Sequence, residues 1–426
     1  MTLDGPRAAA LGALARTRSE PGSAVLLRSA LHARRLLLLK ALLVRVERHR
    51  DAVDAAVFRR FGAAWRLLER VERRRPEVVE DLLDYPTTGG WLATALAAPV
   101  GPALDRHLAR LDVLAVTAAL RSGCPTTLTV DAPGGLLVLP GVGRLRTGAD
   151  RVRVRSGTHT GRLHSDGPER AAPDVLLLTD PRTGALVGRG PGWTGLPVLS
   201  GSAARLDDLD PYRVPVGGIG SPPRGATDHD VTDRAAWSAR WESGLELLHR
   251  TDPSRAGEVR RAVRAIVPLV PCGPGSYGAT LSAAPGAVLT SLPADAPDMA
   301  ETLVHELHHS KLATLHELVP LYRPGRAAAV HRVGWRADPR PVSGVFHGVY
   351  AHLALSDLWR RATAAEGVPA AWRTRAGRQF ERVHDQVGEA LSILLESDEL
   401  TNEGRKFAHQ MKRHHASLKA APGAPG

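Results

Sequence analysis

Cysteine is nearly absent from this chain. Of its 426 residues, only Cys124 and Cys272 are cysteines. Two such distant cysteines form neither a disulfide framework nor a Cys-x-x-Cys metal site, which excludes a small secreted fold held together by disulfides. We expect both thiols to be reduced and structural, as in a cytoplasmic protein.

Long apolar segments are also missing. The longest run, residues 36–44, contains Lys40 and is too short for a bilayer, which needs about 20 residues. The N-terminus has no basic segment followed by an apolar one, so no secretory signal is predicted. The composition, 43% hydrophobic and 23% charged, is that of a globular chain. We therefore expect a cytoplasmic protein without a membrane partner.

Lysine is scarce as well, although the formal net charge is +12. Only five of the 56 basic residues are lysines, a bias more typical of codon composition than of selection for nucleic acid. The arginines are spread along the chain, and no basic patch is interleaved with aromatic residues. Nucleic acid is therefore not a predicted partner, whereas the positive net charge would favour an acidic partner. The sequence carries no signal for an oligomeric state.

The chain does contain alternating helix-like and strand-like segments, which predict a mainly helical α+β fold with a β-rich middle section. The predicted regions are a flexible N-terminus (1–22), a helical region (23–124) interrupted at 86–90, a β-rich region with a long loop (125–232), a catalytic region (233–418) and a disordered tail (419–426). Strands are predicted at 127–130, 136–139, 152–154, 175–178, 277–282 and 286–291, and C-terminal helices at 235–270, 343–364 and 369–417.

The most informative motif is His305-Glu306-Leu307-His308-His309. Two histidines four apart share one face of a helix, so His305 and His309 can reach one metal ion, and Glu306 can face a metal-bound water. Prolines and aspartates at 293–298 give a helix start, and no breaker follows before Pro320. The alternative is a helix that is rich in histidine by chance.

A metal site needs a third ligand. The turn residues at 339–344 predict the start of a new helix, and His347 lies in its first turns, facing back if the two helices form a hairpin. We therefore predict His347 as the third ligand and a zincin-like HExxH helix pair in the C-terminal part. His352 is the competitor, although positions five apart share a helix face poorly.

The segments 300–312 and 335–341, the latter followed by residues 344–348, resemble a known family. It is the family of HExxH-motif peptide-modification proteins from gene clusters for ribosomally synthesised, post-translationally modified peptides. Weaker similarity is present at 206–213 and 135–143, and the resemblance covers most of residues 60–410. It implies a peptide-tailoring enzyme, and some family members are iron- and 2-oxoglutarate-dependent hydroxylases.

By this resemblance, His305, His309 and His347 would hold Fe(II), and Arg336 or Arg340 would pair with a carboxylate of 2-oxoglutarate. The substrate would be a side chain of a ribosomal precursor peptide, and Glu306 would orient a ligand or water. For either arginine the alternative is a structural salt bridge, for instance to Asp338 or Asp357.

Two further functions stay open. A zinc metallopeptidase would use Glu306 as general base, with Tyr350 or Arg336 stabilising the oxyanion. In either enzyme the strand at 286–291 would hold an extended peptide as an edge strand. The last possibility is a non-catalytic peptide-binding protein with a degenerate site.

Overall fold

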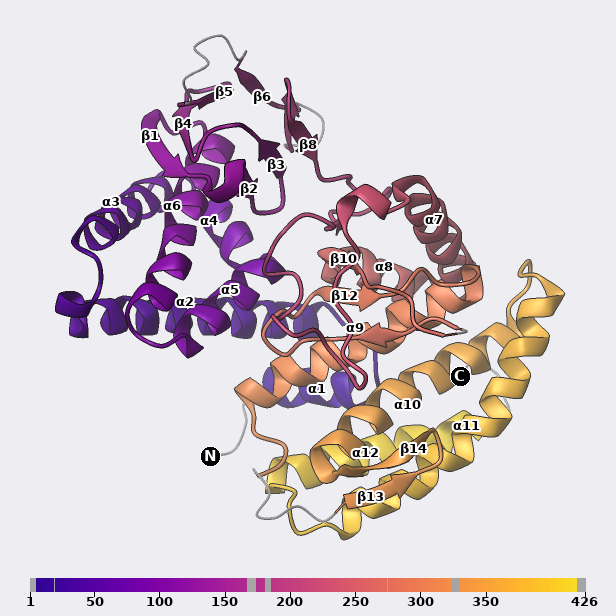
Figure 1. Ribbon diagram of the computed structural model, residues 1–426. Helices are drawn as coiled ribbons and strands as arrows, with labels where there is room; N and C mark the ends of the chain where they lie inside the picture. Colours follow the sequence, from indigo (N-terminus) through magenta and orange to yellow (C-terminus); the bar gives the residue numbers. More distant parts are fainter. Residues whose placement is uncertain are drawn as a thin grey trace.

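The computed structural model describes residues 5–18, 20–166, 174–180, 185–273, 275–323 and 330–419. It is mainly helical and contains several sheets, which confirms the predicted α+β class with its β-rich middle section. Figure 1 shows the N-terminal helices beside the β-rich region, and the C-terminal helices gathered on the other side of the molecule.

The helical region was predicted at 23–124, and helices run through it to residue 122. Its elements are α1 (Gly5–Ala15), α2 (Pro21–Arg48), α3 (Ala55–Glu72), α4 (Pro76–Leu83), α5 (Pro86–Ala97) and α6 (Pro102–Ser122). Proline opens α2, α4, α5 and α6, where its missing N–H is not needed and its fixed φ suits the first turn.

Two predictions in this region are wrong. The segment predicted as a flexible N-terminus contains α1, which buries Leu14 and Ala15 in the same core as the C-terminal helices. The expected interruption at 86–90 is instead the first turn of α5. Gly89 is needed there because a Cβ would overlap the guanidinium of Arg35 and the carbonyl of Ala283.

The β-rich region folds as two antiparallel sheets, as Figure 1 shows at the far end of the N-terminal helices. The first has the order β1 (Thr126–Asp131), β4 (Arg151–Ser156), β5 (Thr160–Ser165), β6 (Val175–Thr179) and β7 (Leu186–Arg189). The second contains β2 (Leu136–Leu139), β3 (Gly143–Arg146) and β8 (Trp193–Gly195). All four strands predicted within 127–178 are confirmed.

A third sheet packs against the helix that carries the His305–His309 motif. Its order is β11 (Gly278–Ala279), β12 (Ala287–Thr290), β10 (Ala265–Pro268) and β9 (Arg205–Leu206). The predicted strands at 277–282 and 286–291 are both present, but β12 lies inside the sheet and cannot accept a peptide as an edge. The edge strand next to β12 is β11, which runs antiparallel to it. The predicted boundary at 232/233 falls between two paired strands of this sheet, since β9 precedes it and β10 follows it.

The C-terminal region is built of long helices around one core. Its elements are α7 (Arg234–Thr251), α8 (Pro253–Ala262), α9 (Ala296–Leu318), the hairpin β13 (Val330–Val333) and β14 (Arg336–Pro341), α10 (Val342–Ala364), α11 (Ala370–Glu396) and α12 (Asn402–Lys419). The helix predicted at 235–270 ends early, giving way to β10, and that at 369–417 breaks at 397–401. The predicted tail 419–426 lies outside the described residues beyond Lys419.

The segment 206–213, one of the weaker matches to the family, has a structural role here. Asp207 accepts a hydrogen bond from the Tyr85 hydroxyl at 2.8 Å, and Asp208 pairs with Arg234 at 2.7 Å. Asp210 pairs with Arg110 of α6. Asp207 and Asp210 thus join the helical region to the segment that follows β9, whereas Asp208 joins this segment to α7.

The apolar run at 36–44 lies within α2. Leu39 and Leu42 are buried, whereas Leu37 is 68% exposed, so the predicted burial of this run holds for one face only. Among the described residues, no helix combines the length and apolarity needed to cross a membrane.

Candidate metal centre

His305 and His309 converge from the middle of α9, as the motif predicts. Asp295 caps this helix by accepting from the Asp298 amide, and the Nε2 atoms of the two histidines lie 3.0 Å apart. Both rings are half-buried. Burial lowers the pKa of His305 to about 3 and that of His309 well below its usual value. Both rings are therefore neutral at pH 7, the form that binds metal ions.

The packing of α9 against α10 brings two more histidines to these rings. The ring centroid of His347 lies 5.7 Å from that of His309, and that of His352 lies 5.0 Å from that of His305. Burial lowers the pKa of each to about 4. The result is a cluster of four neutral imidazoles, which we call the histidine cluster.

His347 and His352 differ in their partners. The Nδ1 of His352 donates to the Gly348 carbonyl at 2.8 Å, which leaves Nε2 with a lone pair. Metal-binding histidines characteristically use such a bond to fix the ring. The Nε2 of His347 lies 3.4 Å from the Tyr322 hydroxyl. Sequence spacing argues against His352, but the structure places it in contact with the motif.

The histidine cluster does not close around an ion without adjustment. Within the described residues, His32, Glu80 and Asp84 are the group whose ligand atoms all lie within 4.8 Å of one another. His305, His309 and an α10 histidine do not meet this limit together. A ring of α10 must therefore turn toward the other two before three nitrogens can share one ion.

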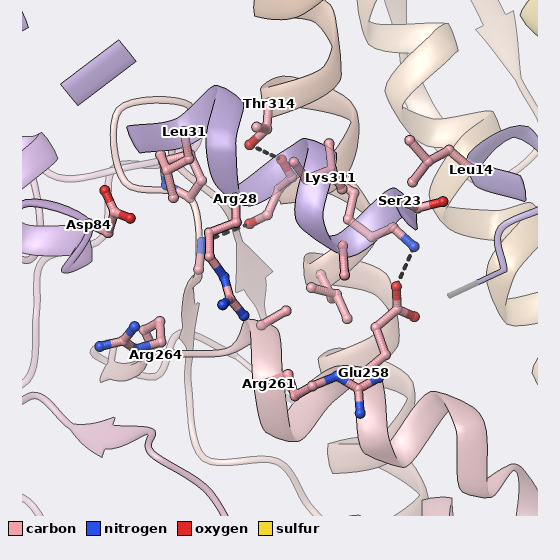
Figure 2. Close-up of a pocket in the computed structure, with 17 residues that line it drawn as sticks. Leu14, Ser23, Arg28, Leu31, Asp84, Glu258, Arg261, Arg264, Lys311 and Thr314 are labelled. Atoms are coloured by element: carbon pink, nitrogen blue, oxygen red, sulfur yellow. Dashed lines mark hydrogen bonds and ion pairs between the residues drawn. The ribbon is translucent and has the colours of Figure 1, made fainter. Parts of the chain in front are cut away.

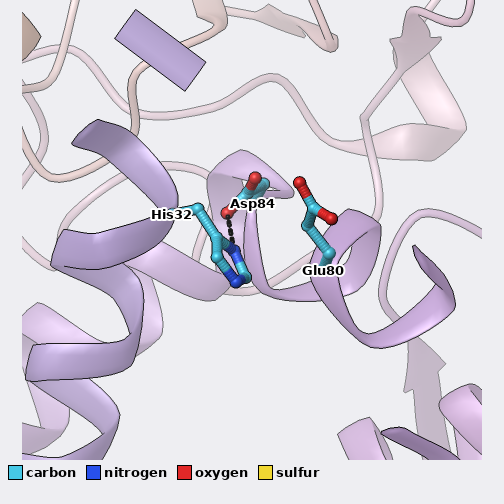
Figure 3. A group of neighbouring side chains, drawn as sticks. All are labelled: His32, Glu80 and Asp84. Atoms are coloured by element: carbon cyan, nitrogen blue, oxygen red, sulfur yellow. Dashed lines mark hydrogen bonds and ion pairs between the residues drawn. The ribbon is translucent and has the colours of Figure 1, made fainter. Parts of the chain in front are cut away.

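The His32, Glu80 and Asp84 group is drawn in Figure 3. His32 and Asp84 already pair at 3.0 Å, and Glu80 is exposed. Burial raises the pKa of Asp84, although the positive charge of nearby Arg35 opposes this rise. This group is accounted for by a hydrogen bond between His32 of α2 and Asp84 at the end of α4.

Glu306 points to the edge of the third sheet. Its carboxylate accepts from the Thr280 hydroxyl at 2.7 Å, and a Cβ on Gly278 would collide with it. Burial raises its pKa to about 7 despite that hydrogen bond. The carboxylate thus lies between the histidine cluster and β11, an edge strand of the third sheet.

Three neighbours of the site were missed by sequence reasoning, namely Thr280, Tyr322 and Trp335. The Trp335 ring stacks on His352 with centroids 4.5 Å apart, and the Tyr322 ring stacks on His316 at 3.9 Å. Trp335 lies in a segment that resembles the family, so that match was a usable signal. Thr280 and Tyr322 follow no periodicity, because they belong to a strand end and a loop.

Arg336 and Arg340 both lie on β14 and both pair with Asp338, at 2.8 Å and 3.3 Å. Their side chains are 49% and 39% exposed. Both arginines thus form the salt bridge to Asp338 that was the alternative to binding a carboxylate of 2-oxoglutarate. Arg340 also packs beside Gly344, in the first turn of α10 and one turn before His347.

Tyr350 does not face the histidine cluster. It is 1% exposed, and its hydroxyl donates to the Leu14 carbonyl at 2.9 Å. Its ring lies 5.3 Å from that of His308, the one histidine of the motif that points to the core. This placement argues against the predicted substrate or oxyanion contact at Tyr350.

A buried ion network holds α9 from behind. Arg255 of α8 donates to the Nε2 of His308 at 3.0 Å and pairs with Glu258 at 3.1 Å and with Asp357 of α10 at 3.3 Å. Glu258 also pairs with Lys311 at 2.5 Å. Because these groups belong to α8, α9 and α10, the network fixes the two histidine-bearing helices relative to each other.

If His347 is the third ligand, its loss should weaken metal binding more than the loss of His352. His347→Ala should weaken metal binding at least about a hundredfold, whereas His352→Ala, which removes a neighbour, should cost about tenfold or less. Metal content after equilibrium dialysis at graded free-metal concentrations measures both. The reverse order of the two losses would assign the third ligand to His352.

No protein-family model matches this chain, and a search of curated proteins finds none that is similar to it.

Proposed function

We propose that this protein is a metal-dependent enzyme that modifies a peptide. Its reaction would be Fe(II)- and 2-oxoglutarate-dependent hydroxylation of a side chain in a ribosomal precursor peptide. The observation that carries the proposal is the histidine cluster, in which neutral imidazoles from α9 and α10 meet beside an open strand edge. The resemblance at 300–312 and 335–348 supports the same reaction.

The donor set suits the metal. Neutral imidazole is a good ligand for iron as well as for zinc. With three protein ligands, Fe(II) keeps positions open for a 2-oxo acid and O₂, which is the chemistry of non-haem iron oxygenases. His305, His309 and His347 would hold the ion in a zincin-like helix pair, and all three keep an exposed edge toward the solvent.

Residues around the cluster would bind the two organic partners. Arg340 lies beside the first turn of α10, so its guanidinium could leave Asp338 and pair with the far carboxylate of 2-oxoglutarate. Arg336 is the alternative on the same strand. The edge of β11 would bind the peptide backbone by strand addition, which places substrate side chains next to Glu306.

A zinc metallopeptidase is the second candidate, and the environment of Glu306 favours it. This carboxylate is buried between the histidine cluster and the peptide-binding edge, and Thr280 fixes its orientation. A general base needs this position, close to a metal-bound water and to the scissile amide.

Anaerobic addition of Fe(II) and 2-oxoglutarate tests the proposed function. We expect a visible metal-to-keto-acid charge-transfer band that requires both additions. Arg340→Ala should shift the 2-oxoglutarate titration of this band to higher concentration, with the exposed Arg155→Ala as control. Tight retention of zinc together with absence of the band would overturn the hydroxylase in favour of the peptidase.

Glu306→Gln separates the two mechanisms. In a hydroxylase the variant should keep iron, the charge-transfer band and turnover within about tenfold, because no proton transfer from Glu306 carries the reaction. A peptidase should lose about 10²–10⁴-fold in rate with its metal retained. Thr280→Val is the matched control, since it keeps the carboxylate and removes only its hydrogen bond.

A further inference from the structure

A cavity lies behind α9, on the side away from the histidine cluster. It has a volume of about 160 Å³ and lies between α2, α8, α9 and the loop residues Pro285 and Gly286. Its apolar walls come from residues such as Leu14, Leu27, Leu31, Ala262, Pro285 and Leu307. Figure 2 shows Lys311 and Glu258, joined by their ion pair, at one side of this cavity.

The size of the cavity limits what it can hold. Pockets for cofactors and drug-sized ligands usually have about 300–1,000 Å³. An engineered apolar cavity of about 150 Å³ holds one benzene molecule. The cavity behind α9 therefore fits one apolar side chain, such as phenylalanine or leucine, better than a whole cofactor.

The lining of the cavity carries more positive than negative charge, because four basic residues line it together with Asp84 and Glu258. Arg28 of α2 and Arg261 of α8 are exposed there, and within the described part of the chain neither has an ion-pair partner. Arg264 and Lys311 also line the cavity but are paired, with Asp81 and Glu258 respectively. Two unpaired guanidinium groups beside an apolar hollow suit a carboxylate that is adjacent to an apolar group.

The loop 280–286 connects this cavity to the proposed reaction site. Its start, Thr280, binds Glu306, and its end, Gly286, lines the cavity and donates to Ser310 of α9 at 3.4 Å. Helix α2 holds the same loop, because Arg34 and Arg35 donate to the carbonyls of Ser282 and Ala283. A chain bound at the cavity can therefore follow this loop to the edge of β11.

We propose that this cavity is a docking site for the peptide substrate. It receives one apolar side chain of the peptide, while acidic residues next to that side chain pair with Arg28 and Arg261. The segment bound here lies behind α9, away from the residue that reacts. This inference rests on the proposed function, because a docking site of this kind serves a peptide that must also reach β11.

Fluorescence anisotropy with the metal-free, full-length protein tests the docking site. The probe is a labelled nonapeptide in which a central phenylalanine has two glutamates on each side and glycine and serine at the ends. Replacing this phenylalanine by alanine should weaken binding at least about tenfold, because the cavity then stays empty. Equal binding of both peptides would overturn the proposal.

Charge reversal tests the rim. The double variant Arg28→Glu with Arg261→Glu should weaken binding of the nonapeptide at least about tenfold. The matched control is Arg151→Glu with Arg155→Glu on β4, which changes the net charge equally at exposed sites and should alter affinity less than about twofold. Equal losses in the two double variants would mean nonspecific attraction and would overturn the docking site.

Two further measurements distinguish a peptide-docking cavity from a site for a small free acid, and the docking site from the reaction site. If 4-phenylbutyrate binds in a manner that depends on Arg28 and Arg261 while the nonapeptide does not bind, the occupant is a free acid and the proposal is wrong.

The iron and 2-oxoglutarate band should be unchanged in the Arg28/Arg261 variant. Failure of that band in the unaltered protein would refute the hydroxylase without affecting the binding result.

Discussion

His309→Ala should abolish stoichiometric metal binding and activity while leaving the fold intact. Its Nε2 lies 3.0 Å from that of His305, and no other residue of α9 places a nitrogen at this point. The loss of a ligand should cost more than the roughly 10–100-fold that removal of a supporting residue costs. Metal per chain after anaerobic loading and gel filtration measures the effect.

The fold should tolerate this change. His309 keeps an exposed edge and bonds only to the neighbouring histidine, and alanine favours the helix. Circular dichroism should therefore show an unchanged spectrum. His159→Ala, at an exposed position in the β-rich region, is the control that should keep full metal content. A His309→Ala protein that still binds one metal ion per chain would mean that the histidine cluster is not the metal site.

The helix that carries the motif could be predicted because its signals are local. Asp295 and Pro297 mark its start, the histidine spacing defines one face, and Pro320 marks its end. The third ligand depends instead on how α10 packs against α9. That packing puts both His347 and His352 near the motif, and a sequence cannot rank two residues whose difference lies in tertiary contacts.

The wrong predictions share a cause, which is that tertiary contacts outweigh local composition. The N-terminal segment looks small and weakly structured, but Leu14 finds a core among the C-terminal helices. The glycines at 89 and 90 look like a break, but they permit close approach of α2 and Tyr212 to α5. Tyr350 was a predicted substrate or oxyanion contact, but it lies in the interior, where its ring is near His308 and its hydroxyl donates to Leu14.

The buried ion network around Arg255, in this interior, should contribute strongly to the stability of the fold. Burial alone would lower the pKa of Arg255, but Glu258, Asp357 and Asp252 together raise it above its usual value. The guanidinium is therefore charged, 3% exposed and bound to groups of three helices. Its removal leaves buried carboxylates with fewer counter-charges, which is far more costly than loss of a surface ion pair.

Arg255→Ala should therefore lower the free energy of unfolding by about 3–5 kcal/mol, as measured by urea denaturation. Arg250→Ala is the matched control, since its ion pair with Glu246 is exposed and should contribute about 0–1 kcal/mol. A loss below about 1 kcal/mol for Arg255→Ala would mean that Lys311 and Arg18 already neutralise the network. The expected loss instead means that the network behind α9 stabilises the histidine-bearing helices from the side opposite the histidine cluster.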